Sequence, residues 1–324
     1  MTDPTHRPLH VLVTGGAGFI GSHLSAALLR RGDQVTALDA FAFGYDSRLK
    51  EANAARLLEH DRFSLVRGDI RDRALLAKVF GDDPPDAVVH LAARAGVRAS
   101  LAEPGEYADV NINGTINILE AMRAAGVDRL VFASSSSVYG ARTDPPFRES
   151  DDVSVPASPY AATKRAGELL CATWSHLYGM KTTCLRFFTV YGPRQRPDMA
   201  ICKFATALRH GHALTLFGDG RSSRDYTFVD DIVQGIIAAV DRPMAHAIIN
   251  LGNHAPVELG ALVAALGRAV GAEPVIERLP DQPGDVPTTC ADITRARVLL
   301  DYHPTVSLED GLARVAAWLG ATDR

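Results

Sequence analysis

Short apolar runs alternate with longer amphipathic stretches through the first half of the chain. The run Leu9–Thr14 is typical of a β-strand, and the stretch Phe19–Arg31 that follows it is typical of a helix. Further strands are expected at Gln34–Leu38, Phe63–Val66, Asp86–Leu91, Arg129–Ala133 and Thr182–Phe187. Further helices are expected at Asp72–Phe80, Val110–Ala125 and Pro159–Tyr178. Because strands alternate with helices, the pattern predicts an α/β fold with a doubly wound parallel sheet.

The residue composition and the pattern of expected elements change after Thr189. Glycine and proline become frequent, as in Tyr191–Pro193 and Phe217–Gly220, and fewer strands alternate with helices. Such a loop-rich region suits a smaller domain that closes over a ligand. We therefore expect one domain over residues 1–186 and a smaller one over residues 187–324.

Composition and charge exclude several classes of protein. The 324 residues include 34 Lys and Arg against 38 Asp and Glu, and the net charge of −4 argues against a broad nucleic-acid-binding surface. No apolar stretch reaches the roughly 18 residues of a transmembrane helix, and the first residues lack a signal-peptide pattern. We expect neither disulfides nor a metal site, because no CxxC pair occurs, and we expect a cytoplasmic protein. The cysteines are Cys171, Cys184, Cys202 and Cys290.

The first predicted strand runs directly into the glycine-rich sequence Thr14–Gly21. Three glycines spaced three residues apart allow a sharp turn and a close approach to a pyrophosphate, which the N-terminus of the next helix attracts. A lone glycine pattern is a weak signal, but this one lies between a strand and a helix, as a dinucleotide site requires. A purely structural tight turn is the alternative. The candidate residues are Gly15, Gly18, Phe19, Ile20 and Gly21.

A carboxylate follows the second predicted strand. Asp39 lies 18 residues after Gly21 and is placed to accept hydrogen bonds from ribose hydroxyls. Because it would repel a 2′-phosphate, it favours NAD over NADP; a chance surface carboxylate is the alternative. Residues that follow the third and fourth strands are candidates for contacts with the adenine or for a close approach to the cofactor. They are Asp69, Ile70, Leu91, Ala92 and Ala93.

Tyr160 and Lys164 are spaced to share one face of the helix predicted over Pro159–Tyr178. A nearby ammonium stabilises a phenolate and lowers the pKa of the tyrosine towards the working pH, as a catalytic base requires. The fifth predicted strand ends in the serines Ser134–Ser137, whose hydroxyls then lie at the same edge of the sheet. Since ligands of such folds bind at the carboxyl ends of the strands, these elements converge on one site. The alternatives are a surface Tyr–Lys pair and a polar loop.

Together these motifs resemble the extended short-chain dehydrogenase/reductase superfamily over nearly the whole chain. The resemblance rests on Thr14–Gly21, on Asn111 in Asn111–Thr115, on Ser135 in Ser134–Gly140, and on the pair Tyr160 and Lys164. Within the superfamily the chain is similar to UDP-glucuronate 4-epimerases. This closer similarity rests on Arg186–Pro193, Arg196–Met199, Ala95–Ser100 and Gln282–Pro287.

The resemblance implies a Rossmann-like NAD-binding domain over residues 1–186, to which residues 228–252 return, and a nucleotide-sugar-binding domain over residues 187–324. It implies that Tyr160 takes the proton from the sugar 4-hydroxyl, that Lys164 holds the nicotinamide ribose, and that Ser135 hydrogen-bonds the reacting oxygen. Asn111 is assigned to the cofactor site. C4 is oxidised to a ketone and then reduced from the opposite face, so the reaction has no net redox change.

The resemblance also implies contacts with a UDP-sugar. Arg224 would bind the diphosphate, Phe217 would lie near the uracil, and Asp285 would lie near the uridine ribose. Related 4,6-dehydratases carry Asp-Glu where this chain has Ser136 and Ser137, which disfavours dehydration. Candidates for binding the C6 carboxylate of a uronic acid are Arg98, Ser136, Ser137, Thr189 and Arg196.

A uronic acid requires protection during this reaction, because its 4-keto form is a β-keto acid and loses CO₂ easily. We hypothesise that the hydroxyls of Ser136, Ser137 and Thr189 hold the carboxylate away from the orientation that favours decarboxylation.

Several alternatives remain open at the level of the sequence. They are a 4-epimerase of UDP-glucose or another nucleotide sugar, a decarboxylase or dehydratase, and a catalytically silent NAD-binding regulator. The helices predicted over Val110–Ala125 and Pro159–Tyr178 have apolar, alanine-rich faces. Related enzymes pair these helices between subunits, so a homodimer is expected; packing only against the sheet is the alternative.

Overall fold

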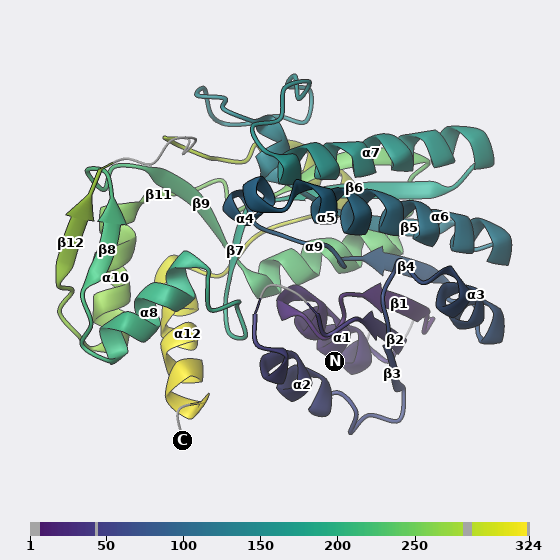
Figure 1. Ribbon diagram of the computed structural model, residues 1–324, viewed down its shortest axis with the longest axis horizontal. Coiled ribbons are helices and arrows are strands. Elements are labelled where there is room, and N and C mark those ends of the chain that lie inside the picture. The colour runs from purple at the N-terminus through teal and green to yellow at the C-terminus, as the bar shows by residue number, and fades with distance from the viewer. Residues whose placement is uncertain (1–6, 43–44, 281–286, 323–324) are drawn as a thin grey trace. The chain divides into compact units, whose positions relative to one another are not determined.

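The computed structural model describes residues 7–42, 45–280 and 287–322. A seven-stranded sheet joins the strands of the first half of the chain with β6 and β10 of the second half (Figure 1). The strand order is β10-β6-β5-β4-β1-β2-β3. Strand β1 pairs in parallel with β2 and β4, and the pairs β2–β3 and β4–β5 are parallel too, which confirms the predicted doubly wound fold. The strands are β1 (His10–Thr14), β2 (Gln34–Asp39), β3 (Phe63–Arg67), β4 (Ala87–His90), β5 (Arg129–Ser135), β6 (Lys181–Phe187) and β10 (His246–Leu251).

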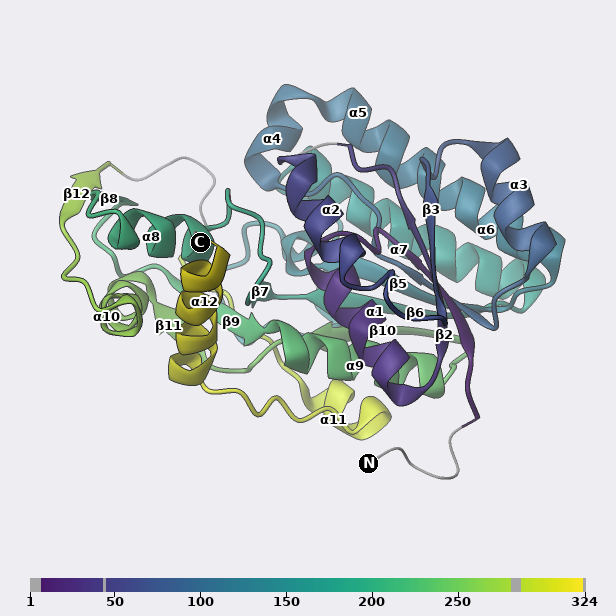
Figure 2. The ribbon, with the colours of Figure 1, turned by 90° about the horizontal axis from the view of Figure 1, so that it is seen from below.

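Helices cover both faces of this sheet (Figures 1 and 2). One face carries α3 (Arg73–Asp82), α6 (Gly114–Ala125) and α7 (Pro159–Tyr178). The other carries α1 (Phe19–Arg31) and α9 (Val229–Asp241). Shorter elements lie in the connections: α2 (Ser47–Ala55), α4 (Val97–Ala102), α5 (Pro104–Ala108), the π turn η1 (Asp109–Asn113) and the 3₁₀ turn η2 (Ser136–Tyr139).

The predicted elements of the first half are present, with boundaries shifted by a few residues. One expectation needs correction: the helix predicted over Val110–Ala125 is not a uniform α-helix, because its first turn is the π turn η1. The hydrophobic period of the sequence does not reveal this wider turn, since apolar residues still face the core on both sides of it. The helices α2, α4 and α5 were not predicted, because they are short and half of their residues or more lie outside the core.

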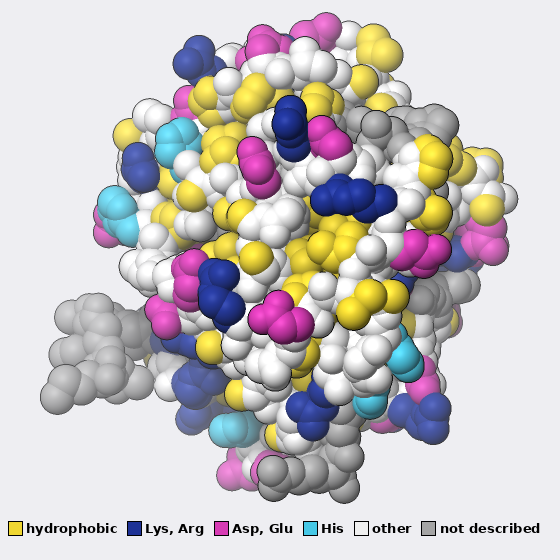
Figure 3. Space-filling view, turned by 90° about the vertical axis from the view of Figure 1, so that its left-hand side faces the viewer, with side chains coloured by type: hydrophobic (Ala, Val, Ile, Leu, Met, Phe, Trp, Pro, Cys, Tyr) yellow, Lys and Arg dark blue, Asp and Glu magenta, His cyan; other side chains and the backbone are white. Residues whose placement is uncertain are grey.

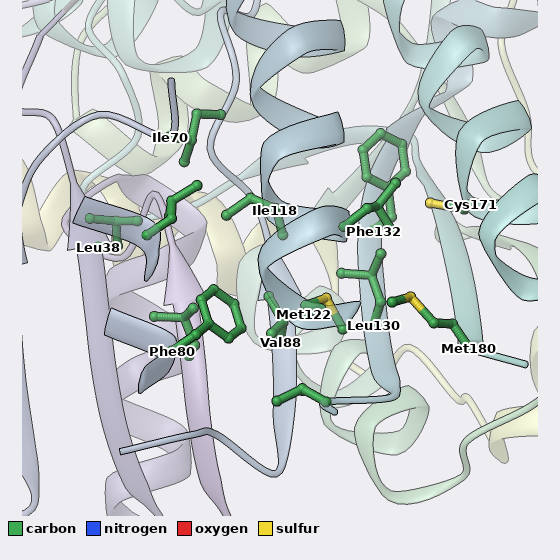
Figure 4. Close-up of a cluster of buried hydrophobic side chains, with 14 of the residues drawn as sticks. Leu38, Ile70, Phe80, Val88, Ile118, Met122, Leu130, Phe132, Cys171 and Met180 are labelled. Atoms are coloured by element: carbon green, nitrogen blue, oxygen red, sulfur yellow. The ribbon is translucent and has the colours of Figure 1, made fainter. Parts of the chain in front are cut away.

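The main core lies between the sheet and the helices α3, α6 and α7. Figure 4 shows Phe80, Ile118 and Met122 packed against Val88 and Leu130 of the central strands. These side chains are almost fully buried, and each contributes about 1.5–3 kcal/mol through removal of apolar surface from water. This packing fixes α3 and α6 against the central strands β4 and β5.

The residues group into two compact units. The first contains Met1–Gly140, Asp152–Arg186 and Val233–Ile249, and the second contains Ala141–Asp151, Phe187–Ile232 and Asn250–Arg324. The segment 141–151 groups with the second unit because Phe147 N donates to Cys290 O (2.8 Å) and Phe147 O accepts from Asp292 N (2.9 Å). The domain division expected from the sequence, at residue 186, would instead assign residues 141–151 to the first domain.

The second unit is built from two small sheets and several helices. One sheet has the order β11-β9-β7, and in the other β8 pairs in parallel with β12. The strands are β7 (Thr189–Tyr191), β8 (Leu214–Phe217), β9 (Ser223–Phe228), β11 (Pro256–Glu258) and β12 (Ile276–Leu279). The helices are α8 (Ala200–Arg209), α10 (Leu259–Val270), α11 (Thr294–Leu300) and α12 (Leu308–Thr322).

Surface charge is mixed rather than segregated. On the face shown in Figure 3, positive and negative side chains of the described residues are interspersed. A mixed surface of this kind does not produce the single-signed field that draws proteins onto polyanions. No helix in the described parts of the chain is both long enough and apolar enough to cross a membrane.

Candidate active site

The glycine-rich turn after β1 is so tight that side chains do not fit at three of its positions. Gly15 has a φ of +71°, and a Cβ at this position would lie 2.9 Å from Ala92 N. A Cβ on Gly21 would lie 2.2 Å from Gly15 O, and one on Gly16 would lie 2.5 Å from the Cβ of Ala37. Helix α1 then begins at Phe19 with no capping side chain, so the N–H groups of its first turn face an approaching anion. The turn therefore fits the pyrophosphate of a dinucleotide.

Asp39 ends β2 as a buried carboxylate with three donors around it. Its Oδ2 accepts from Ala17 N (3.2 Å), and its Oδ1 accepts from Phe41 N (2.8 Å). Its third donor is Lys50 on α2, whose Nζ lies 3.1 Å from Oδ1. The carboxylate is thus fixed beside the glycine-rich turn, where a ribose of the cofactor would accept or donate hydrogen bonds.

Lys50 is a candidate that sequence reasoning missed. It reaches Asp39 only because a loop and the short helix α2 bring it back to the end of β2, and its Nζ also donates to Ala42 O (3.3 Å). The eleven-residue separation of Asp39 and Lys50 matches no helical or strand period, so the sequence carried no signal for this pair.

The segment that follows β4 borders the glycine-rich turn, and the segment that follows β3 meets the end of β2, where Gly68 N donates to Asp39 O (3.0 Å). Asp69 is held by Arg71, whose Nη2 donates to Oδ2 (2.8 Å), and these hydrogen bonds lower the pKa of the Asp69 carboxyl although its burial opposes the shift. Ile70 is buried, and its side chain would clash with any Cβ at Gly114. The residues Leu91, Ala92 and Ala93 follow β4, and Ala92 N donates to the hydroxyl of Thr14 beside Gly15 (3.1 Å).

Buried His90 connects the start of the glycine-rich turn to α6 through a chain of hydrogen bonds. The hydroxyl of Thr115 donates to Asn111 O (2.6 Å), so it accepts from Nε2 of His90 (3.1 Å). Nδ1 of His90 is then the acceptor for the hydroxyl of Thr14 (2.7 Å). The partners therefore assign the neutral Nε2–H tautomer. Burial, assisted by the charge of Lys164, lowers the pKa of His90 to about 3, so the imidazole stays neutral at working pH.

His90 should make the fold sensitive to mild acid. Below the ordinary pKa of 6.5 the unfolded chain binds a proton at this residue, whereas the folded chain does not until its pKa of about 3 is reached. Stability is therefore lost as the pH falls through 6.5, by about 2 kcal/mol at pH 5. Urea unfolding at pH 7 and pH 5 measures this loss. His90→Asn should reduce the difference between the two pH values, while the exposed His303→Asn should leave it unchanged; equal differences in all three proteins would contradict the assignment.

Helix α7 presents Tyr160 and Lys164 at the carboxyl end of β5. Its start is fixed by Pro159 at the first helical position and by the hydroxyl of Ser158, which accepts from Ala161 N (3.1 Å). Tyr160 lies one residue into the helix, and its ring meets that of buried Tyr107 edge-on, with 6.2 Å between the centroids. Tyr160 and Lys164 therefore lie on one face of a helix whose start is fixed.

Lys164 is buried beneath this face. Its Nζ donates to Ala133 O (2.7 Å) and lies 5.1 Å from the ring centroid of Phe132. Burial lowers the pKa of Lys164 to about 8, against the opposing effect of the nearby Cys171 and Glu168 groups. A group with a pKa near neutrality is suited to proton transfer, and its charge stabilises a phenolate close by.

The serine segment, defined as Ser134–Tyr139, lies at the carboxyl end of β5 and includes the turn η2. The hydroxyl of Ser135 accepts from Ser137 N (3.1 Å) and caps the turn η2, and it also donates to Ser137 Oγ (3.1 Å). Ser136 and Ser137 are half-buried. The first unit therefore brings the predicted residues Ser135, Tyr160 and Lys164 to the carboxyl ends of the central strands.

Asn111 lies within the π turn η1 and links two parts of this edge. Its Oδ1 accepts from Arg94 N (2.8 Å), and its Nδ2 donates to Arg94 O (3.0 Å) and to the hydroxyl of Thr163 on α7 (3.0 Å). Asn111 thus joins the loop after β4 to helix α7. Single π turns within helices recur at functional sites, and this one turns the amide towards the loop.

The predicted substrate residues lie in different parts of the fold. Thr189 begins β7 opposite Tyr226 of β9, and Arg224 lies two residues earlier in β9, where its Nη1 donates to Ser223 O (2.9 Å). Arg196 is paired with Asp198 (Nη2–Oδ2, 2.7 Å). Phe217 ends β8 in the other small sheet, and Arg98 is exposed on α4 of the first unit. Asp285 lies outside the described residues.

The described residues contain no group of three or more His, Cys, Asp or Glu side chains arranged to hold a metal ion. This edge gathers the hydroxyls of the serine segment and the amine of Lys164, and the glycine-rich turn adds its backbone amides. These groups are suited to a nucleotide cofactor and to proton transfer at an alcohol.

Residues 11–252 match the model of the NAD dependent epimerase/dehydratase family. The chain belongs to this family. It is 46% identical to UDP-glucuronate 4-epimerase 3 of Arabidopsis thaliana over 97% of this chain and 77% of that protein. It is 43% identical to the UDP-glucuronate 4-epimerase of Thermodesulfobacterium geofontis, over 95% of each. The family predicted from the sequence is thus confirmed.

A solved structure extends the similarity to the fold. The UDP-glucuronic acid 4-epimerase from Bacillus cereus, in complex with UDP-glucuronic acid and NAD, superposes with a TM-score of 0.91 at 37% identity. The superposition covers 97% of this chain and 99% of that one.

Proposed function

We propose that this chain catalyses the NAD-dependent C4 epimerisation of UDP-glucuronic acid to UDP-galacturonic acid. The observation that carries the proposal is the similarity, over nearly the full length, to proteins named UDP-glucuronate 4-epimerase. The edge formed by Ser135, Tyr160 and Lys164 supplies the groups that the reaction needs.

The first unit is the NAD-binding domain in this proposal. The turn Gly15–Gly21, including Gly18, Phe19 and Ile20, holds the pyrophosphate, and Asp39 with Lys50 holds a ribose. NAD, when bound, supplies the acceptor and donor of hydrogen at C4. The other residues of the cofactor site are Asp69, Ile70, Leu91, Ala92, Ala93, Asn111, Tyr160 and Lys164.

Tyr160 acts as the base and acid of the reaction. It takes the proton of the 4-hydroxyl as C4 becomes a ketone and returns a proton when C4 is reduced from the opposite face. The charge of Lys164 favours the phenolate, because the two groups share one face of α7. Ser135 donates a hydrogen bond to the reacting oxygen and so limits the positions that the oxygen adopts.

The second unit is the nucleotide-sugar-binding domain. Arg224 binds the diphosphate, since a guanidinium forms paired, charge-assisted hydrogen bonds with phosphate oxygens. Phe217 contacts the uracil. The candidates for binding the carboxylate of the uronic acid are Thr189 and Arg196 of this unit, and Ser136, Ser137 and Arg98 of the first unit.

We also propose that the protein is a cytoplasmic homodimer. All four cysteines are buried free thiols, which suits a reducing compartment. Leu169 and Leu177 on α7 are exposed by 53% and 59%, and an interface between copies of this chain would cover them. Light scattering tests the dimer, and a monomer mass at micromolar concentration would contradict it.

Separate incubation of the purified protein with UDP-glucuronic acid and with UDP-glucose tests the function. We expect UDP-galacturonic acid, formed without added NAD because the cofactor is retained through turnover. Conversion of UDP-glucose alone would keep the mechanism and refute the carboxylate contacts of Thr189 and Arg196. Release of CO₂ as the main reaction would instead indicate a decarboxylase.

Loss of the hydroxyls around the carboxylate should alter the products. If the carboxylate turns freely, the C5–C6 bond of the 4-keto intermediate breaks, CO₂ leaves, and the electron pair forms an enolate that takes a proton at C5. The result would be a UDP-4-keto-pentose, and the two electrons removed from C4 would stay with the cofactor, so each such event would consume one NAD. Ser137→Ala and Thr189→Ala should therefore raise the share of this product several-fold, as measured by chromatography of the nucleotides. An unchanged product ratio in both variants would refute the role of the hydroxyls.

A further inference from the structure

A buried ion pair joins α7 to β6 directly behind the serine segment. Glu168 and Arg186 are both 1% exposed. Arg186 Nε donates to Glu168 Oε1 (2.8 Å), and its Nη2 donates to Oε2 (2.9 Å). The pair is thus bidentate, the geometry that fixes both side chains in one orientation.

The pair reaches the first residue of the serine segment through Glu168. The hydroxyl of Ser134 donates to Glu168 Oε1 (2.6 Å), and Ser134 directly precedes Ser135. Glu168 lies one helical turn beyond Lys164, whose Nζ donates to Ala133 O (2.7 Å). Two successive residues at the end of β5 are therefore tied to the same face of α7.

The pair reaches the last residue of the segment through Arg186. The guanidinium carbon lies 4.8 Å from the ring centroid of Tyr139, which ends the turn η2. Arg186 thus stacks on the residue at one end of the segment while its partner Glu168 binds the residue at the other end. Ser135, Ser136 and Ser137 lie between these two fixed points.

Stability alone gives a poor account of this arrangement. Replacement of a buried ion pair by apolar side chains of similar volume is often neutral or stabilising. In addition, Nη1 of Arg186 is buried with no hydrogen-bond partner in the described structure. A buried unsatisfied donor costs about 1–3 kcal/mol, so the pair is not optimised for stability.

We propose that Glu168 and Arg186 are positioning residues, which hold both ends of the segment Ser134–Tyr139 and so set the places of its three central hydroxyls. The functional consequence rests on the proposed epimerase activity. Ser135 must meet the reacting oxygen while Ser136 and Ser137 hold the carboxylate, and a misplacement of about 1 Å can cost about 10²-fold in rate. A loosened segment should slow turnover and release the carboxylate, whereas UDP binding in the second unit should be unaffected.

Glu168→Gln tests the role of the carboxylate. We expect kcat to fall about 10–100-fold with KM within about threefold, and the UDP-4-keto-pentose share to rise. Glu168→Asp, which retains the charge, should recover part of both. Arg165→Gln is the matched control, because Arg165 also donates to Glu168 Oε2 (3.0 Å) but takes no part in the contacts of Ser134 and Tyr139 described above. This control should keep the wild-type product ratio.

Ser134→Ala removes only the link between Glu168 and the segment, and it leaves the ion pair intact. It should reproduce the altered product ratio of Glu168→Gln with a smaller change in melting temperature, so the test stands even where the charge variant fails to fold. A wild-type ratio and kcat in Ser134→Ala, or a lower melting temperature in Glu168→Gln without any kinetic change, would overturn the proposal.

A crystal structure of Ser134→Ala separates this inference from the proposed function. A displaced segment supports the positioning role whichever nucleotide sugar is the substrate, and an unmoved segment contradicts it. A wild-type protein that does not convert UDP-glucuronic acid refutes the proposed function instead.

Discussion

Replacement of Tyr160 by Phe is expected to lower kcat for epimerisation by about 10²–10⁴-fold, the usual range for loss of a general acid–base group. Tyr160 lies in the first turn of α7, one helical turn before buried Lys164 and therefore on the same helix face. Removal of one hydroxyl preserves the ring that packs on Tyr107, at 6.2 Å between centroids, so folding and NAD binding should be retained. The variant therefore tests proton transfer by the phenol without disturbing the fold.

Initial-rate measurements with UDP-glucuronic acid give this comparison directly. Tyr178→Phe is the matched control, because Tyr178 lies on the same helix but is 48% exposed at its far end. Its kcat should stay within about twofold of the wild-type value. A Tyr160→Phe enzyme that retained the wild-type kcat would show that another group transfers the proton.

Replacement of Gly21 by Ala should abolish retention of NAD. The added methyl would lie 2.2 Å from Gly15 O and 2.8 Å from Gly16 Cα, so the backbone of the turn itself must move. Overpacking of this kind costs about 1–3 kcal/mol, and here the displaced atoms are those that would face the pyrophosphate. We expect loss of bound nucleotide, measured after denaturation of the purified protein, together with a lower melting temperature.

Gly81→Ala provides the control for this substitution. Gly81 also lies in a helix, α3, but a Cβ there meets no atom within 4 Å. Alanine should therefore stabilise the helix by about 0.5–1 kcal/mol and leave the NAD content unchanged. Equal NAD content in both variants would contradict the assignment of the turn to the cofactor.

The sequence predicted those parts of the site that depend on local geometry. The spacing of Gly15, Gly18 and Gly21 indicates a tight turn, and in the structure a Cβ would lie 2.9 Å from a backbone atom at Gly15 and 2.2 Å from one at Gly21. Tyr160 and Lys164 share a face because they are one helical turn apart. The serines end a strand that is buried and regular, so their position at the sheet edge follows from the strand order.

Contacts between distant segments were not predictable in the same way. Lys50 meets Asp39 through a loop and a short helix whose sequence has no strong period. The imidazole of His90 joins Thr14 to Thr115 across three elements, and its tautomer follows only from the partners that the fold supplies. The π turn at Asn111 could not be predicted from the hydrophobic pattern either. Apolar residues face the core on both sides of this turn, so the pattern is the same as for a regular helix.

By itself the sequence determined the alternation of strands and helices, the glycine-rich turn and the helix face that Tyr160 and Lys164 share, because each depends on residues a few positions apart. Only the tertiary structure decided that Glu168 and Arg186 enclose the serine segment from both ends. These residues are 18 positions apart, and burial of both charges depends on the packing of α7 against the sheet. Local periodicity carries no information about such a contact, since its energy arises from the low-dielectric interior that the whole fold creates.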